Sequence, residues 1–241
     1  MPRFRFALER SQRPAMVRPP LPMKTFPTLA CLALIASPLP AAETPVPVQQ
    51  EPFHQTVFEN TWLRVIDVQV PVGKTTKYHV HVLPSVIVYL TKAANRSQTW
   101  GETTTTPRAT TLGDSRYAPY DVTALTHQVT NPGPAHFRVL DIELLKPAGP
   151  TPVPPLATPN AQLRWDEKLV RFYSVSLPAG GQLAVPATAN AHLVVGIAGT
   201  AAAGARRELR NGDYEFQGPN TAFQIRNAGP DQVELVLLEL K

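Results

Sequence analysis

Two histidines separated by one residue are the feature of this sequence that most directly indicates chemistry. His79-Val80-His81 comes just before a strand-like run, Ser85 to Leu90. Residues i and i+2 of a strand face the same side, so both imidazoles can converge on one metal ion. A third ligand must come from elsewhere, and His127 is placed for it. Imidazole suits Fe, Ni, Cu and Zn, and Mn is also compatible; a surface pair without metal is the alternative.

The segments around these histidines predict an all-β protein. Several runs alternate apolar and polar residues, as half-buried strands do, and turn signals such as NPGP and RNGD separate them. No segment keeps a helical period, and the 27 prolines disfavour long helices. Many short strands without helices indicate a sandwich or barrel. The clearest strand-like runs are Leu63–Val72, Ser85–Leu90, Phe137–Leu145, Leu193–Ile197 and Val233–Leu240.

The two halves of the chain repeat each other. The segment from Trp62 to Gly73 matches Leu169 to Gly180 without a gap, and Asn131 to Leu144 matches Asn227 to Leu240 in the same way. Equal spacing at both ends predicts two copies of one β-domain.

The spacing around the histidines resembles the two sequence motifs of the cupin superfamily. In the first motif, five residues separate Gly73 from His79-Val80-His81, as in the family. Ser85 occupies the place of the family's glutamate, and Lys92 that of a glycine. The resemblance covers nearly all of 57–147 and implies a small antiparallel β-barrel, a double-stranded β-helix or jelly roll, that holds one metal near its centre.

The second motif is matched with one substitution and a short insertion. Gly113, Pro119, His127 and Asn131 fit the family pattern, while Asp121 replaces a glycine and about three extra residues precede His127. Because serine is a poor metal ligand, the resemblance implies a three-histidine set, His79, His81 and His127, with open positions left for water. The implied cofactor is one divalent transition metal, Fe, Mn, Ni or Zn. The alternative is a metal-free pocket whose imidazoles are satisfied by their neighbours.

The second half of the chain keeps the spacing of the two motifs but lacks most of their metal-ligating residues. Pro186-Ala187-Thr188 stands in place of the histidine pair, and Phe223 in place of the distal histidine. His192 occupies the glutamate position alone, and a lone histidine is more often a pocket residue than a ligand. The chain thus resembles a bicupin, whose halves pack as the subunits of a cupin homodimer do, and its C-terminal barrel is expected to be structural.

The other polar candidates are assigned structural or surface positions. His54 lies in the lead to the first barrel and is expected to be exposed, as is His136 at a turn. Glu143 and Glu239 match in the repeat. Because the second domain lacks ligands, the match favours a salt bridge or a solvated edge for both.

The net charge of +5 reflects a leader, not a nucleic-acid surface. Six of the 23 basic residues and one of the 18 acidic residues lie in 1–42, so 43–241 carries 17 of each. Met23-Lys24, an apolar stretch from Phe26 to Ala36 and a small-residue end at Ala41 or Ala42 predict a secretory signal peptide. The true start is predicted at Met23, the alternative being a genuine longer leader. The apolar stretch is too short to span a membrane.

Export of this kind predicts a periplasmic or secreted bacterial protein. The single cysteine, Cys31, lies in the apolar stretch, too early for a lipid-anchor site, so the mature chain contains no thiol and no disulfide. The predicted division is a leader over 1–42, an N-terminal cupin over 43–147, a proline-rich linker over 148–163 and a degenerate cupin over 164–241.

Two classes of function remain open on these residues. The first is a metal-dependent enzyme, an oxygenase of a small organic substrate, since open metal positions can bind substrate and dioxygen. The second is a non-catalytic module that binds a small molecule or serves as a structural subunit. Fold alone does not choose between them. A small-molecule ligand, a homo-oligomer, no nucleic acid and no membrane span are expected in either case.

Overall fold

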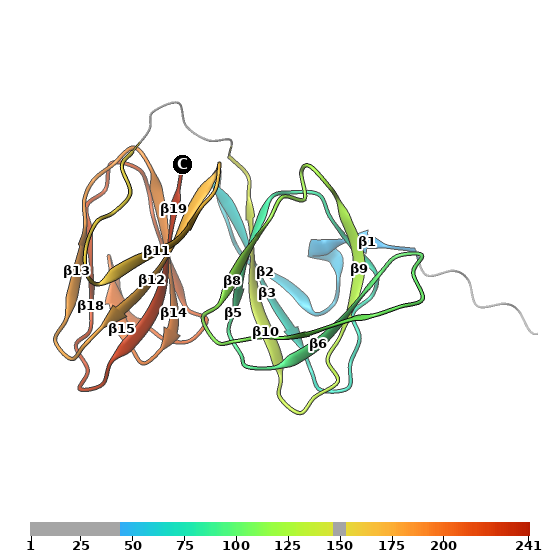
Figure 1. Ribbon diagram of the computed structural model, residues 1–241. Helices are drawn as coiled ribbons and strands as arrows, with labels where there is room; N and C mark the ends of the chain where they lie inside the picture. Colours follow the sequence, from blue (N-terminus) through green and yellow to red (C-terminus); the bar gives the residue numbers. More distant parts are fainter. Residues whose placement is uncertain (1–43, 147–152) are drawn as a thin grey trace, which may run out of the picture. The chain divides into compact units, whose positions relative to one another are not determined.

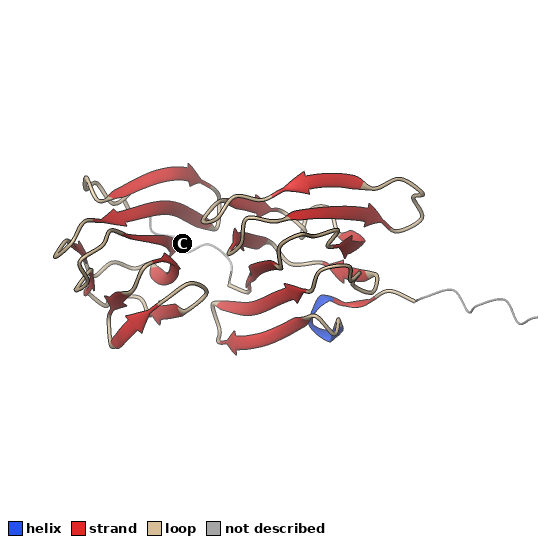
Figure 2. Cartoon of the chain, turned by 90° about the horizontal axis from the view of Figure 1, so that it is seen from below, coloured by secondary structure: helices blue, strands red, loops and turns tan. Residues whose placement is uncertain are grey.

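The computed structural model describes residues 44–146 and 153–241 as strands, turns and one short helix (Figures 1 and 2). The predicted leader, with Met23 and Cys31, lies outside the described residues, as do residues 147–152, which include the first five residues of the predicted linker. The helix η1 (Val48–Gln50) has three residues, so no described helix approaches the length of a bilayer span. The all-β prediction is confirmed.

The first barrel consists of two facing five-stranded sheets (Figure 1). All pairings are antiparallel except that of β1 with β4. The ligand-bearing sheet has the order β1 (Val46–Pro47), β4 (His79–His81), β9 (Leu125–Thr130), β6 (Ala94–Thr99), β7 (Thr106–Ala109). The opposing sheet has the order β2 (His54–Glu59), β3 (Leu63–Val70), β10 (Phe137–Leu144), β5 (Ser85–Tyr89), β8 (Ser115–Ala118).

The second barrel repeats this topology, which confirms the internal repeat. Its first sheet has the order β11 (Ala161–Asp166), β12 (Val170–Leu177), β19 (Val233–Leu240), β14 (Ala191–Ala198), β17 (Tyr214–Gln217). Its second sheet has the order β13 (Gln182–Val185), β18 (Phe223–Arg226), β15 (Ala201–Ala203), β16 (Arg206–Leu209). Strand β11 begins inside the range assigned to the linker, because Ala161 already pairs with Val175.

The matched asparagines of the repeat stabilise the same turn in each barrel. The Asn131 amide donates to the carbonyl groups of Val70 and Ala135, and the Asn227 amide donates to those of Leu177 and Asp231. Each side-chain carbonyl accepts a backbone N–H two residues on. These bonds hold the loop between β9 and β10 in the first barrel and the loop between β18 and β19 in the second. The repeated asparagine therefore meets the same hydrogen-bonding requirement in both barrels.

The matched glutamates form buried ion pairs, as the sequence indicated. Glu143 accepts from Arg64 at 2.6 Å, and Glu239 accepts from Arg171 at 3.2 Å. Each pair joins the two central strands of its sheet, β3 with β10 and β12 with β19.

The central strands β3, β10 and β5 of the opposing sheet are largely buried on both faces. The outer residues of this sheet, among them Val65, Val88 and Ile142, belong to one apolar cluster with Phe172 and Leu193 of the second barrel. Its inner face closes the cavity that contains the histidines. Residues of the C-terminal barrel therefore cover the outer face of the sheet whose inner face lines the cavity.

Candidate metal centre

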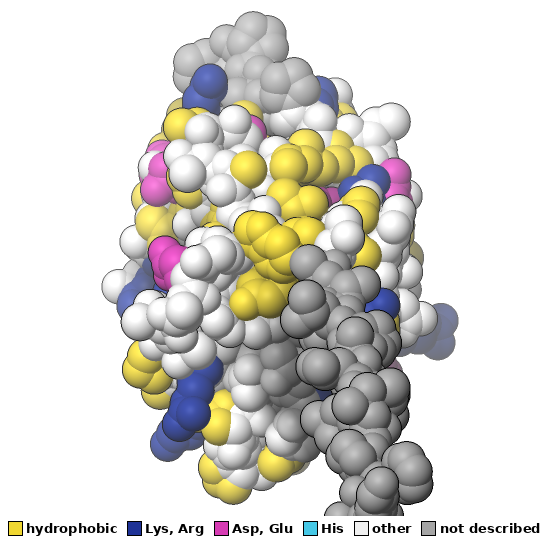
Figure 3. Space-filling model, turned by 90° about the vertical axis from the view of Figure 1, so that its right-hand side faces the viewer, with side chains coloured by type: hydrophobic (Ala, Val, Ile, Leu, Met, Phe, Trp, Pro, Cys, Tyr) yellow, Lys and Arg dark blue, Asp and Glu magenta, His cyan; other side chains and the backbone are white. Residues whose placement is uncertain are grey.

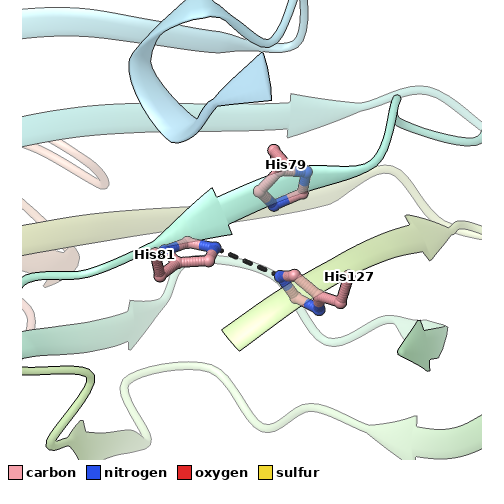
Figure 4. A group of neighbouring side chains, drawn as sticks. All are labelled: His79, His81 and His127. Atoms are coloured by element: carbon pink, nitrogen blue, oxygen red, sulfur yellow. Dashed lines mark hydrogen bonds between the residues drawn. The ribbon is translucent and has the colours of Figure 1, made fainter. Parts of the chain in front are cut away.

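The three histidines of the predicted ligand set lie together at the centre of the first barrel (Figure 4). His79 and His81 lie two residues apart on β4 and therefore face the same side of the strand. His127 on β9 is the register partner of His79. One nitrogen from each imidazole lies within 4.8 Å of the others. All three side chains are buried, and no described histidine is visible on the face of the molecule drawn in Figure 3. The local strand geometry thus brings together what the spacing predicted.

Each imidazole has a polar partner at Nδ1, outside the cluster. His79 Nδ1 donates to the carbonyl oxygen of Lys77 at 2.9 Å, and His127 Nδ1 is 2.9 Å from the Ser97 hydroxyl. His81 Nδ1 lies 3.2 Å from a carboxylate oxygen of Asp141. A carbonyl can only accept, so the proton of His79 is held at Nδ1, and the nearby Asp141 carboxylate favours the same tautomer of His81 by its charge, without a hydrogen bond between them. Their Nε2 lone pairs are then free for a metal, which is the usual arrangement behind metal-bound histidine.

The spacing of the nitrogens fits a shared metal ion. His81 Nε2 and His127 Nε2 are 3.1 Å apart (dashed in Figure 4). Two nitrogens bound at about 2.0–2.1 Å to one ion lie roughly 2.9–3.4 Å apart, from octahedral to tetrahedral angles. The donor set therefore suits a first-row divalent metal.

Burial keeps the imidazoles of His79 and His127 neutral, which is the form that binds metal. Desolvation, with repulsion from the neighbouring histidines, lowers the pKa of His79 from 6.5 to about 3 and that of His127 to about 2. Burial acts to raise the pKa of Asp141, but its contacts with His81 outweigh this and the pKa is lowered. Asp141 is thus an anion 3.2 Å from Nδ1 of the His81 ring.

His54 is buried beside the cluster, so the expectation that it is exposed was wrong. Its exposed fraction is 8%, and its ring centroid is 4.5 Å from that of His79. The side chain of Glu51 explains the burial: one carboxylate oxygen contacts His54 Nδ1 at 2.5 Å and accepts from Phe53 N, and the other accepts from Lys77 N. Burial acts to raise the pKa of Glu51, yet its bonds to His54 and the backbone leave it lowered. His136 is exposed, as predicted.

A cavity of about 190 Å³ borders the three histidines. Its wall is mixed, with apolar side chains from both sheets and a few polar groups. Ser85, at the position of the family's glutamate, is not part of this wall, because its hydroxyl donates to the Leu83 carbonyl at 3.1 Å. The lining residues are His54, Val68, His79, His81, Ile87, Tyr89, Asn95, Ser97, Arg108, Arg116, Tyr120, Leu125, His127, Val129, Phe137, Val139 and Asp141.

The corresponding positions of the second barrel are filled by its core. Phe223 is buried, and its ring centroid is 5.6 Å from that of His192. His192 pairs with Glu239 across the strands, as Ser85 pairs with Glu143, which confirms the predicted equivalence of His192 and Ser85. Burial lowers the pKa of His192.

Asp141 and Arg116 are site residues that no sequence motif marked. Both reach the cavity from the opposing sheet, where Ile87 pairs with Asp141 on one side and with Arg116 on the other. The signal that could have found Asp141 is its place between Leu140 and Ile142 in a long, mostly apolar strand, since a carboxylate buried there needs a partner.

No protein-family model and no curated protein matches the sequence, whereas solved structures match its fold. An oxalate decarboxylase of Lactobacillus farciminis, solved as a formate complex, is 11% identical with a TM-score of 0.55 over 78% of this chain and 80% of its own. The pirin YhhW of Escherichia coli in complex with nickel(II) is 16% identical, with a TM-score of 0.52 over 78% of this chain and 90% of its own. A salicylate 1,2-dioxygenase of Pseudaminobacter salicylatoxidans is 11% identical, with a TM-score of 0.54 over 74% and 71%.

These likenesses and the repeated sheet topology define the fold. The chain has the cupin fold, with two cupin barrels in tandem and a three-histidine cluster in the first.

Proposed function

We propose that this chain binds one divalent transition metal through His79, His81 and His127 and acts as an oxygenase on a small organic substrate. The observation that carries the proposal is the convergence of three buried imidazoles on the edge of a cavity. Such a metal supplies open positions at which substrate and dioxygen bind. The residues of the chain hold the ligand rings, exclude water and shape the space for the substrate.

The similar structures support this class of reaction without specifying it. One of these proteins is a salicylate 1,2-dioxygenase and another is an oxalate decarboxylase. The third, a pirin, was solved in complex with nickel(II). Iron, nickel, manganese and zinc are therefore the metals to test. The identities of 11% to 16% leave the substrate to be determined from the cavity itself.

The test is oxygen uptake by protein purified without a histidine tag and loaded separately with Fe(II), Mn(II), Ni(II) or Zn(II). Panels of thiols, diketones, phenols and aromatic acids serve as substrates. The proposal expects uptake with one redox-active metal and one substrate class, lost in His81→Ala/His127→Ala and retained in His136→Ala. Stoichiometric metal with no uptake on any panel would favour the non-catalytic binding module.

Export to the periplasm or the medium is part of the proposal. It rests on the layout of 23–42, which lies outside the described residues. Expression in a bacterial host followed by N-terminal sequencing tests it: the proposal expects a chain that begins after Ala41 or Ala42, and a cytoplasmic chain with an intact leader would contradict it.

A further inference from the structure

Arg116 brings a positive charge into the cavity from the sheet opposite the histidines. It lies on β8 as the register partner of Ile87, which itself pairs with Asp141 on β10. Cross-strand partners point to the same face, and all three side chains line the cavity. The guanidinium is near enough to His127 to help lower the pKa of that ring. It therefore lies on the same cavity as the candidate metal centre.

The guanidinium of Arg116 has no carboxylate partner in the described part of the chain. One terminal nitrogen donates to the Tyr120 hydroxyl at 2.8 Å, while Nε is buried without an acceptor among the described residues. The arginines of the long central strands differ, since each is paired within 3.2 Å: Arg64 with Glu143, Arg138 with Asp67 and Arg171 with Glu239. Arg116 is half-buried, with its Nε buried, and a partly desolvated charge without a counter-ion has a cost that a ligand anion would offset.

Two acidic side chains near the cavity, Asp141 and Glu51, each lie beside a histidine instead of an arginine. Asp141 contacts His81, and Glu51 accepts from His54 and two backbone N–H groups. Arg108, exposed at the cavity edge, adds a second guanidinium and forms no ion pair within residues 44–146 and 153–241. The charged side chains on the cavity wall, apart from the histidines, are therefore two guanidinium groups and the one carboxylate of Asp141.

We propose that Arg116 binds the carboxylate of a small organic acid whose apolar body packs against Val68, Ile87 and Val139. A guanidinium matches a carboxylate in two parallel hydrogen bonds, and the free Nε with its neighbouring terminal nitrogen forms one such pair of donors. The volume of about 190 Å³ limits the ligand to a compact acid. This inference deepens the proposed function by naming the substrate class, and it rests on the same cavity.

The test is calorimetric titration of the purified chain, metal-free and metal-loaded, with benzoate and with benzamide as its neutral isostere. Cyclohexanecarboxylate and propanoate extend the acid series. The proposal expects each acid that binds to do so more tightly than its amide. Arg116→Gln should weaken benzoate binding by about tenfold to hundredfold, and Arg116→Lys should restore part of the loss. Arg226→Gln, an exposed arginine of the second barrel, is the matched control and should leave binding unchanged.

A second readout separates binding from folding. Because Arg116 carries an uncompensated charge, Arg116→Gln should unfold at an equal or higher temperature than the wild type. Acids that bind no better than their amides, unchanged benzoate affinity in Arg116→Gln, or no binding by any acid of the series would overturn the proposal. If carboxylate preference depends on Arg116 while the wild type takes up no metal, the metal function fails and the carboxylate site stands. If the wild type takes up stoichiometric metal and Arg116→Gln changes no affinity, the carboxylate site fails and the metal function stands.

Discussion

Asp141 Oδ2 lies 3.2 Å from Nδ1 of His81, although the two residues belong to opposite sheets of the first barrel. The sheet that carries none of the three candidate ligands thus orients one of them. The contact also joins the two sheets at the centre of the barrel, where His81 and Asp141 are both buried. Metal binding and barrel closure should therefore be linked through this pair.

Asp141→Asn should weaken metal binding by about tenfold to hundredfold, because the ring of His81 loses the anion that holds its proton at Nδ1. Competition with a chromophoric chelator measures the affinity. Asp67→Asn is the matched control, since Asp67 is a buried aspartate of the same sheet that bonds Arg138 instead of a histidine. Equal affinity of the Asp141→Asn and Asp67→Asn variants would show that Asp141 has no orienting role.

The metal-free protein should lose stability as the pH falls from about 6.5 toward 3. The pKa values of His79 and His127 are lowered to about 3 and about 2 in the folded chain, so in this window the unfolded chain binds protons that the folded chain does not. Each such imidazole contributes roughly 1.4 kcal/mol per pH unit to the decline. Urea unfolding at pH 7, 6 and 5 measures it. A His79→Gln/His127→Gln variant should show a flatter dependence, and an unchanged slope would contradict the burial of neutral rings.

Glu239→Ala should destabilise the chain by about 3–5 kcal/mol, because it removes the buried partner of Arg171 and leaves only Asp166, whose side chain is 38% exposed. The carboxylate also accepts from Tyr173 and Asn190, so their donors lose an acceptor as well. Urea unfolding measures the loss, with Glu234→Ala on the exposed end of the same strand as the control. A loss below about 1 kcal/mol would mean that the matched glutamates do not stabilise the repeat.

Sequence reasoning succeeded where chemistry depends on neighbours along the chain. The alternation of His79 and His81 is a property of one strand, and the spacing from Gly113 to Asn131 marked His127. The repeat likewise predicted the equivalence of Glu143 and Glu239, which the two arginine pairs confirm. Each of these patterns is set by strand periodicity and turn spacing.

Sequence reasoning failed for side chains whose positions depend on packing between distant segments or between the two sheets. His54 precedes the first long strand and has no local apolar pattern, but Glu51 and the ring of His79 bury it. Asp141 and Arg116 read as ordinary polar residues of strands, and their roles follow from a register that pairs both with Ile87. Such pairings join segments far apart in the chain, and one sequence does not specify them.

The most direct test of a metal centre in the first barrel is the metal content of the purified, untagged chain, measured by inductively coupled plasma mass spectrometry. We expect about one equivalent of a divalent transition metal in the wild type and in His136→Ala, and less than about a tenth of that in His81→Ala/His127→Ala. Circular dichroism of the double variant should show that its strands persist. A folded wild type that takes up no metal from Fe(II), Mn(II), Ni(II) or Zn(II), or a double variant that retains it, would contradict the three-histidine metal centre.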